Sequence, residues 1–248
     1  MDRYEVLHPV WRDPAGSTYV ARSPDGQPVA VRFLPAEPAP DLSRGRLLTA
    51  IRHPNLAGVR ELVAGPRLAV VSEVVEGVAL RRRGPVAPAA AARIGAGIAA
   101  GLHALHEAGV VHQHLNPANV VVARSGDVLL TDIALGPLLG ASPAGRQRLH
   151  AGLGAGLSPE VAAGAAPSVA SDLYALGVVL AGLMPGLMRG LLRALLAPDP
   201  NSRPASAADV RRWLINSRSA IHVTDDQVVA TYQTSTYSEE YSAWSSSS

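Results

Sequence analysis

Strand-like segments fill the first part of this chain, and helix-like segments fill most of the remainder. Residues 4–34 contain short runs with valine and tyrosine, separated by DPAG and SPDG turns, and this composition is typical of strands. Residues 88–106, PAAAARIGAGIAAGLHALH, predict a long helix of small residues, and residues 171–184, SDLYALGVVLAGLM, predict a buried apolar helix. Since the strands precede the helices and do not alternate with them, the sequence predicts an α+β fold of two lobes.

The composition limits both the core and the classes of partner. Apolar residues make up 48% of the 248 residues but aromatic residues only 4%, so alanine, valine and leucine must form the core. The absence of cysteine excludes disulfides and thiolate metal sites and suits a cytoplasmic protein. We expect no signal peptide and no membrane span, because the longest apolar run, residues 173–184, is shorter than roughly 20 residues. A net charge of +2 is too small to indicate nucleic-acid binding.

Composition also indicates where the domains begin and end. We expect a small β-rich lobe over residues 1–76 and a larger helical lobe over residues 77–214. After Arg218 arginine disappears and serine, threonine and tyrosine dominate, so residues 215–248 are predicted to form a flexible tail. The tail is either a linker or, at residues 219–248, an arm that engages a protein or peptide partner.

One stretch has the form of a catalytic loop. VVHQHLNPANVVV at residues 110–122, followed by LLTDIAL, resembles the eukaryotic-like protein kinases in their bacterial Ser/Thr form, and the composition is actinobacterial in style. The resemblance extends from about Tyr4 to Leu214 and implies a protein-kinase-like fold with a shortened region after the central apolar helix. Further landmarks follow in the family's order: HPN (53–55), SEVVEGVALR (72–81), SPE (158–160), SDLYALGVVL (171–180) and DPNSRP (199–204).

The resemblance implies that the residues which support the kinase scaffold are present. A spine of buried side chains joins the two lobes of a kinase, and its members here are Leu48, His112, Ile133 and Asp172. Ala30 and Val121 occupy the positions that enclose an adenine ring. Glu160 and Arg203 are expected to form the buried ion pair of the large lobe.

The residues that hold ATP in this family are mostly replaced. Trp11 and Asp13 stand at the first two glycines of the phosphate-covering loop, where a bulky side chain and a negative charge both oppose a triphosphate. All 22 basic residues are arginine, and Arg32 occupies the position of the phosphate-binding lysine. Arg44 occupies the position of the helix glutamate that pairs with this lysine. We therefore expect Arg32 to face Arg44, and the two like charges to push the helix outward.

The catalytic loop keeps only part of the family's chemistry. His114 replaces the aspartate that orients the substrate hydroxyl, and Asn116 replaces the lysine that steadies the transferred phosphoryl group. A neutral histidine accepts a proton in principle, but it lacks the charge of a carboxylate. Asn119 and Asp132, the metal-binding positions of the family, are retained and are the candidate ligands of a cation. Ala134 replaces the flexible glycine that follows them in the family.

Three functional hypotheses follow from these residues. The first is a pseudokinase: a catalytically inactive protein that acts as a protein- or peptide-binding scaffold or allosteric subunit, in signalling or in a peptide-modifying complex, without a cofactor. The alternative is an atypical Ser/Thr kinase-like phosphotransferase that retains Mg-ATP binding through Asp132 and Asn119. The third is a metal site formed by three histidines, His112, His114 and His150. Because several supports of phosphoryl transfer are changed together, the sequence favours the first.

Overall fold

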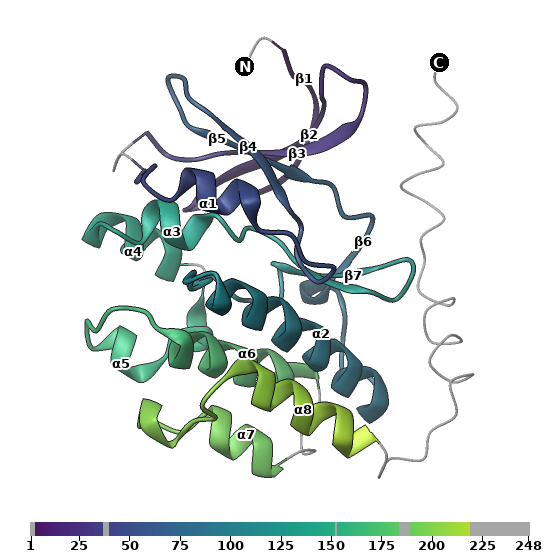
Figure 1. Cartoon of the computed structure of the whole chain (residues 1–248), viewed down its shortest axis with the longest axis vertical. Coiled ribbons are helices and arrows are strands. Elements are labelled where there is room, and N and C mark those ends of the chain that lie inside the picture. Colours follow the sequence, from purple (N-terminus) through teal and green to yellow (C-terminus); the bar gives the residue numbers. More distant parts are fainter. Residues whose placement is uncertain (1–2, 37–39, 152, 184–188, 219–248) are drawn as a thin grey trace.

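The computed structural model describes residues 3–36, 40–151, 153–183 and 189–218, which form a β-sheet lobe and a helical lobe (Figure 1). The small lobe is a five-stranded antiparallel sheet, in the order β1-β2-β3-β5-β4, with one helix. Its elements are β1 (Glu5–Asp13), β2 (Gly16–Arg22), β3 (Pro28–Phe33), α1 (Gly45–Ala50), β4 (Val59–Val63) and β5 (Ala69–Glu73). The α+β fold of two lobes expected from the sequence is confirmed.

The large lobe combines a small second sheet, β6-β7-β8, with the remaining helices (Figure 1). Its first elements are β6 (Gly77–Ala79), the 3-10 helix η1 (Leu80–Arg82), α2 (Pro88–Glu107), β7 (Val120–Ala123) and β8 (Val128–Leu130). They are followed by α3 (Leu135–Leu139), α4 (Pro143–His150), η2 (Gly154–Gly156), α5 (Pro159–Ala162), α6 (Val169–Leu183), α7 (Arg189–Leu195), η3 (Pro200–Ser202) and α8 (Ala207–Arg218). Within the described ranges, no helix combines the length and the apolar character that crossing a membrane requires.

The last helix extends further than the sequence predicted. The tail was expected from residue 215, but α8 continues to Arg218. Ser206 supports the start of this helix, because its hydroxyl oxygen accepts a hydrogen bond from the Asp209 amide at 3.1 Å. Near its end, α8 is stabilised by packing on α2, which buries Leu214. The proposed partner-binding arm, residues 219–248, lies outside the described residues.

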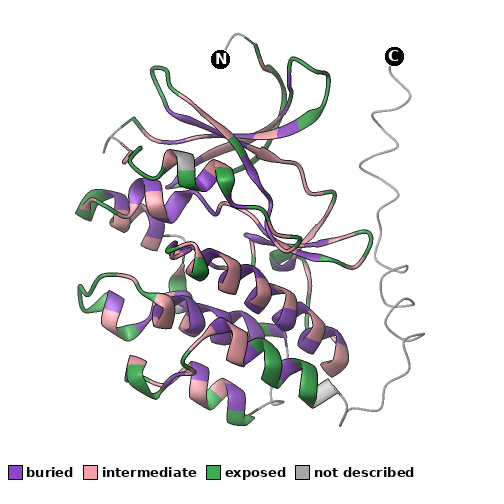
Figure 2. Ribbon diagram, viewed as in Figure 1, coloured by how far each residue is buried: buried purple, intermediate pink, exposed green. Residues whose placement is uncertain are grey.

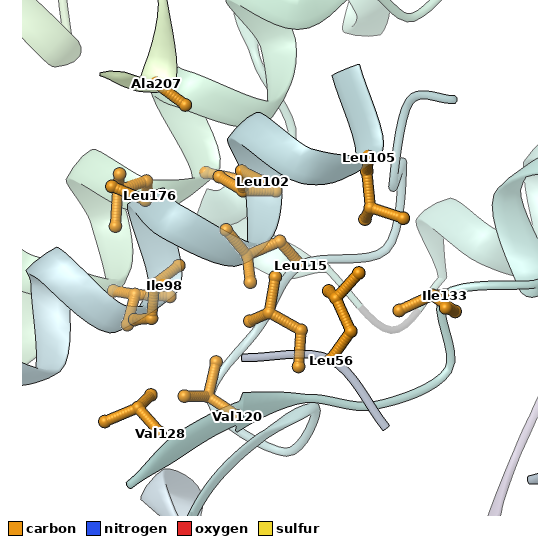
Figure 3. Packing of buried hydrophobic residues seen from close by; sticks show 14 of the residues in the cluster. Leu56, Ile98, Leu102, Leu105, Leu115, Val120, Val128, Ile133, Leu176 and Ala207 are labelled. Atoms are coloured by element: carbon orange, nitrogen blue, oxygen red, sulfur yellow. The ribbon is translucent and has the colours of Figure 1, made fainter. Parts of the chain in front are cut away.

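Small residues allow α2 to lie at the centre of the large lobe. A Cβ atom at Gly95 would lie 2.7 Å from Leu180 Cδ2 in α6, and one at Gly101 would lie 2.8 Å from the Asn55 carbonyl oxygen. The neighbouring segments therefore approach the backbone of α2 closely, and the faces of α2 and α6 that meet are buried (Figure 2). Figure 3 shows the larger side chains that α2 adds to this core, Ile98, Leu102 and Leu105.

The segment after β8 folds into two short helices, α3 and α4, which pack against the predicted catalytic loop at residues 112–119. Leu138 in α3 and Leu149 in α4 are both at most 1% exposed. A Cβ atom at Gly136 would overlap the carbonyl oxygen of His112, so α3 lies directly on the loop. The hairpin of α3 and α4 is thus part of the core and covers one side of the loop.

Two helical glycines provide a test of how tightly this hairpin is packed. A Cβ atom at Gly145 in α4 would overlap the Leu139 carbonyl oxygen, whereas one at Gly182 in α6 would meet nothing within 4 Å. We expect Gly145→Ala to lower the free energy of unfolding by about 1–3 kcal/mol, because backbone must shift to accept the methyl group. Gly182→Ala should raise it by about 0.4–1 kcal/mol, since alanine restricts the unfolded chain. Urea denaturation measures both, and equal effects of the two substitutions would show that α4 is not closely packed.

Candidate functional site

The guanidinium group of Arg32 lies between the two lobes, where Arg32 lines a small cleft together with Ser72 of β5 and Asp132. Arg32 lies on β3 and is only 3% exposed. Its Nη2 atom contacts Asp13 Oδ1 at 2.5 Å, and its Nη1 atom contacts Asp132 Oδ2 at 3.1 Å. Nη1 also donates a hydrogen bond to Thr18 Oγ1 at 3.0 Å. One buried cation therefore joins the end of β1, the strand β2 and the segment after β8.

The charges of this cluster shift the titration of its members. Burial alone would lower the pKa of Arg32, but attraction to Asp132 and Asp13 outweighs burial and raises it. Burial raises the pKa of Asp132, and attraction to Arg32 opposes this effect only in part. Arg32 is thus permanently charged, and the two carboxylates compete to neutralise it.

The turn from β1 to β2 is fixed by contacts among its own residues, Trp11, Asp13 and Ala15. Besides Arg32, Asp13 Oδ1 accepts a hydrogen bond from the Ala15 amide at 2.8 Å, and Asp13 Oδ2 accepts one from Trp11 Nε1 at 3.1 Å. The Arg81 guanidinium stacks on the Trp11 ring, 3.9 Å from the ring centre. Since Trp11 belongs to β1 and Arg81 to η1, this contact joins the two lobes at the mouth of the cleft.

The expected facing pair of Arg32 and Arg44 does not form, and that prediction is wrong. Arg44 precedes α1 and its Nη1 donates to the Gly109 carbonyl oxygen at 2.5 Å, on the large lobe. Arg32 instead pairs with carboxylates in the cleft. Each guanidinium has found its own acceptor, so the predicted repulsion is absent.

The predicted catalytic loop is anchored to α6 through Asp172. The Asp172 carboxylate accepts hydrogen bonds from the amides of His112 at 2.8 Å and Gln113 at 3.0 Å, and contacts His106 Nε2 at 2.9 Å. Gln113 has a left-handed backbone conformation, with φ of 61°, which the two amide contacts help to hold. This anchoring fixes the position of the next residue, His114.

His114, the position of the family's catalytic carboxylate, is buried beneath α4. It is only 2% exposed, and its ring forms a hydrogen bond with the Leu149 backbone. Burial lowers the pKa of His114 to about 4, so the imidazole is neutral at pH 7. Its Nδ1 atom is buried and has no hydrogen-bond partner within the described residues. At 2% exposure, His114 offers almost no surface to a substrate hydroxyl in this arrangement.

The two retained metal-binding positions are engaged within the protein. Asn119 is 3% exposed and its Nδ2 donates to the His114 carbonyl oxygen at 2.9 Å, which Asn116 Nδ2 also contacts at 3.0 Å. Asp132 is paired with Arg32, and its backbone has φ of 59°. In the part of the chain that the structure describes, no group of three or more acidic or histidine side chains is arranged to hold a metal.

The hypothesis of a three-histidine metal site is wrong for the described residues. The ring of His112 is already used, because Nδ1 accepts from the His114 amide at 3.3 Å and Nε2 lies 3.2 Å from the Thr131 carbonyl oxygen. Burial also lowers the pKa values of His112 and His150. These histidines are neutral parts of the packing around the loop.

The arrangement of Arg32, Asp13 and Asp132 does not fit Mg-ATP, the cofactor of the family that the chain resembles. The donors of Arg32 that would meet a phosphate face Asp13, Asp132 and Thr18. A triphosphate placed there would meet two carboxylates before it met the cation. Ala30 on β3 and Val121 on β7, the positions around an adenine ring, are both half-buried.

The remaining scaffold residues lie in the core. The four positions predicted for the spine are each at most 2% exposed: Leu48, His112, Ile133 and Asp172. Glu160 and Arg203 form a bidentate ion pair with N–O distances of 2.6 and 2.7 Å. This pair lowers the pKa of Glu160 through its hydrogen bond, and Arg203 donates further to the Ala197 and Ala170 carbonyl oxygens at 2.9 Å.

Sequence reasoning missed the partnership between Asp13 and Arg32, and the contact between Trp11 and Arg81. Asp13 was read only as a charge that repels a triphosphate. A signal for the pair was present, because an acidic and a basic substitution fall in the same cleft of the resembling fold. Taken together, their opposite charges indicate a salt bridge.

Comparisons with known proteins agree with the fold and the order of these residues. The protein kinase domain family matches residues 14–189. The serine/threonine-protein kinase PkaB of Streptomyces coelicolor is 34% identical over 198 residues, which are 72% of this chain and 47% of that protein. PkaA of the same organism is 35% identical over 190 residues, 69% of this chain and 35% of that protein. Pkn2 of Myxococcus xanthus is 32% identical over 195 residues, 71% of this chain and 24% of that protein. The chain therefore spans less than half the length of these relatives.

The buried, neutral state of His114 predicts a dependence of stability on pH. With a pKa near 4 in the folded protein and a usual value of 6.5, His114 takes up its proton first in the unfolded chain. The free energy of unfolding should fall as the pH drops from 6.5 to 4, with a contribution from His114 of roughly 3 kcal/mol. His114→Gln removes this titration and should reduce the slope of the dependence in urea denaturation between these pH values, while the other buried histidines, such as His112, keep their share. The control His103→Gln changes a half-buried histidine of α2 and should change the slope less than His114→Gln does; equal slopes in all three proteins would contradict the assignment.

Proposed function

Because the chain belongs to the protein kinase family, in its bacterial Ser/Thr form, we propose that it is a pseudokinase that binds a protein or peptide partner without transferring a phosphoryl group. The observation that carries this proposal is the burial of His114 beneath α4, where the family places its catalytic carboxylate. A general base must come within hydrogen-bond reach of the hydroxyl that it activates. Here the imidazole faces the Leu149 backbone instead.

The charges around the cleft support the same proposal. Phosphoryl transfer depends on positioning and on stabilising negative charge, for which the family uses lysines and a helix glutamate. This chain contains no lysine, and Arg44 stands at the glutamate position. The buried cation Arg32 is already paired with Asp13 and Asp132.

A second candidate function is Ser/Thr kinase-like phosphotransfer with Mg-ATP bound through Asp132 and Asn119. The names of the relatives favour this candidate, since PkaB, PkaA and Pkn2 are all called serine/threonine-protein kinases. It requires that α4 leave His114, that Asp13 leave Arg32, and that Asn119 turn away from the His114 carbonyl oxygen. Each of these three rearrangements breaks contacts that are present in the structure, and we therefore place this candidate second.

The outer edge of the small lobe supports a binding role. Among the described residues, strand β1 pairs with β2 alone, and its apolar side chains Val6, Leu7 and Val10 are 44%, 44% and 51% exposed. The pairing of β1 with β2 has two register irregularities, and β1 contains Pro9. Both features oppose the unspecific addition of another strand to this edge. An exposed apolar strand with these features suits a protein or peptide partner.

Phosphotransfer assays separate the two candidates. We expect the full chain, incubated with radiolabelled ATP and Mg²⁺ or Mn²⁺, to label neither itself nor casein above the level of its Asp132→Asn variant. We also expect no rise in melting temperature with millimolar nucleotide, because a ligand that binds the folded state stabilises it. Labelling by the wild type at ten times the level of Asp132→Asn would establish the enzyme and reject the pseudokinase.

A separate experiment tests whether β1 binds a protein or peptide partner. Crosslinking in cells that express the natural protein should capture a specific partner with the wild-type chain. The double substitution Leu7→Ser and Val10→Ser should reduce this capture at least tenfold, because it removes exposed apolar surface without disturbing the core. The matched control is Leu42→Ser, which removes another exposed leucine, next to α1. Undiminished capture by the β1 variant would exclude this strand as the binding surface.

A further inference from the structure

Three donors beside the cleft, Arg32 Nη2, the Ala15 amide and Trp11 Nε1, hold an anion that is a side chain of the protein itself, Asp13. We propose that the Asp13 carboxylate is the resident ligand of Arg32, in place of a phosphate group, and that Asp13 is the residue which excludes polyphosphates from the cleft. The inference goes beyond the proposed function, because it concerns what the cleft binds and not whether the protein transfers a phosphoryl group.

Both oxygens of the Asp13 carboxylate are held by donors of the kinds that bind phosphate. Oδ1 receives Arg32 Nη2 at 2.5 Å and the Ala15 amide at 2.8 Å. Oδ2 receives the indole Nε1 of Trp11 at 3.1 Å. Charged guanidinium and backbone amide donors make strong hydrogen bonds to carboxylate and phosphate oxygens alike. The Asp13 carboxylate therefore occupies the hydrogen-bond donors that a phosphate group would need in order to bind here.

The charge of the cluster opposes a second anion. Arg32 contributes one positive charge, while Asp13 and Asp132 contribute two carboxylates within 3.1 Å of it. With both carboxylates ionised the cluster is negative, and even with Asp132 protonated it is only neutral. A polyphosphate that approaches Arg32 would be repelled or, at best, not attracted. Loss of the Asp13 charge alone would free the Nη2 edge of the guanidinium and remove one negative charge.

Trp11 positions the carboxylate. Its indole donates to Asp13 and stacks beneath the Arg81 guanidinium at 3.9 Å. The Arg81 amide in turn donates to the Pro117 carbonyl oxygen at 2.8 Å, close to the predicted catalytic loop. Asp13 is thus held from both lobes, and an anion that displaced it would also have to disturb this stack.

The proposal differs measurably from a purely structural role for the ion pair. If Asp13 served only to stabilise the fold, its removal would weaken folding and would create no affinity for anions. If it occupies a phosphate position, its removal leaves Arg32 and its neighbouring donors without an anion, and an added polyphosphate should take the vacated place.

The test uses the full chain, sodium tripolyphosphate as the probe, and isothermal titration calorimetry at fixed ionic strength. The wild type should show no binding at millimolar tripolyphosphate, whereas Asp13→Asn should bind the probe with a dissociation constant at least tenfold below the highest concentration tested and should gain melting temperature with it. Asp127→Asn is the matched control, because it removes one charge from an exposed turn between β7 and β8. Adding Arg32→Gln to Asp13→Asn should abolish the gain.

Each outcome decides the proposal. A folded Asp13→Asn protein that binds tripolyphosphate no better than Asp127→Asn overturns it, as does a wild type that binds as tightly as Asp13→Asn. If Asp13→Asn is unfolded in buffer, tripolyphosphate should restore the folded state where sulfate of equal ionic strength does not; failure to restore it overturns the proposal. Phosphoryl transfer by the wild type would reject the proposed function, whereas transfer gained only in Asp13→Asn would support this inference. Absence of tripolyphosphate binding by Asp13→Asn would reject this inference and leave the proposed function intact.

Discussion

The carboxylate of Asp172 holds the loop on which both the helical lobe and the cleft depend. It joins three elements, because it projects from α6, contacts His106 of α2 at 2.9 Å, and accepts the amides of His112 and Gln113. Buried amides without an acceptor cost about 1–3 kcal/mol each, and the left-handed conformation of Gln113 adds strain of roughly the same size. With this carboxylate in place, the loop keeps one shape, and His112 lies 3.2 Å from the carbonyl oxygen of Thr131, the residue before Asp132.

The same rule about buried charge explains the cleft. A guanidinium that is 3% exposed needs compensating acceptors, whether a ligand, a helix glutamate or another carboxylate supplies them. In this chain the helix position carries Arg44, which turns to the Gly109 carbonyl oxygen, so Arg32 takes its partners from the ends of other elements. Asp13 at the end of β1 and Asp132 after β8 pair with its two terminal nitrogens. These ion pairs join the two lobes through contacts within the chain.

The fold was predictable from the sequence because its determinants are local or ordered along the chain. The strand-like start, the small-residue pattern of α2 and the apolar α6 are each readable without knowledge of distant contacts. The cleft was less predictable, since its pairing depends on which substituted residues meet in space. Asp13 and Arg32 lie on different strands, and a position-by-position comparison with the kinase family treats each as a separate loss. The helices α3 and α4 were missed for another reason: the glycine-rich stretch from residue 136 has weak helix propensity, and tertiary packing of Leu138 and Leu149 stabilises it.

Under the proposed function, coupling among these substitutions means that no single reversion would rebuild a kinase site. A lysine at position 32 would still face the Asp13 and Asp132 carboxylates, and would lose the planar fork that now contacts both. An aspartate at position 114 would be buried beneath α4, beside the Leu149 backbone, where an ionised carboxylate would lack its usual solvation. A glutamate at position 44 would lose the contact with Gly109 and would find Arg32 already paired. Residues in one contact network have non-additive effects, so none of these three single changes restores the family's arrangement: Asp13 still pairs with position 32, and α4 still covers position 114.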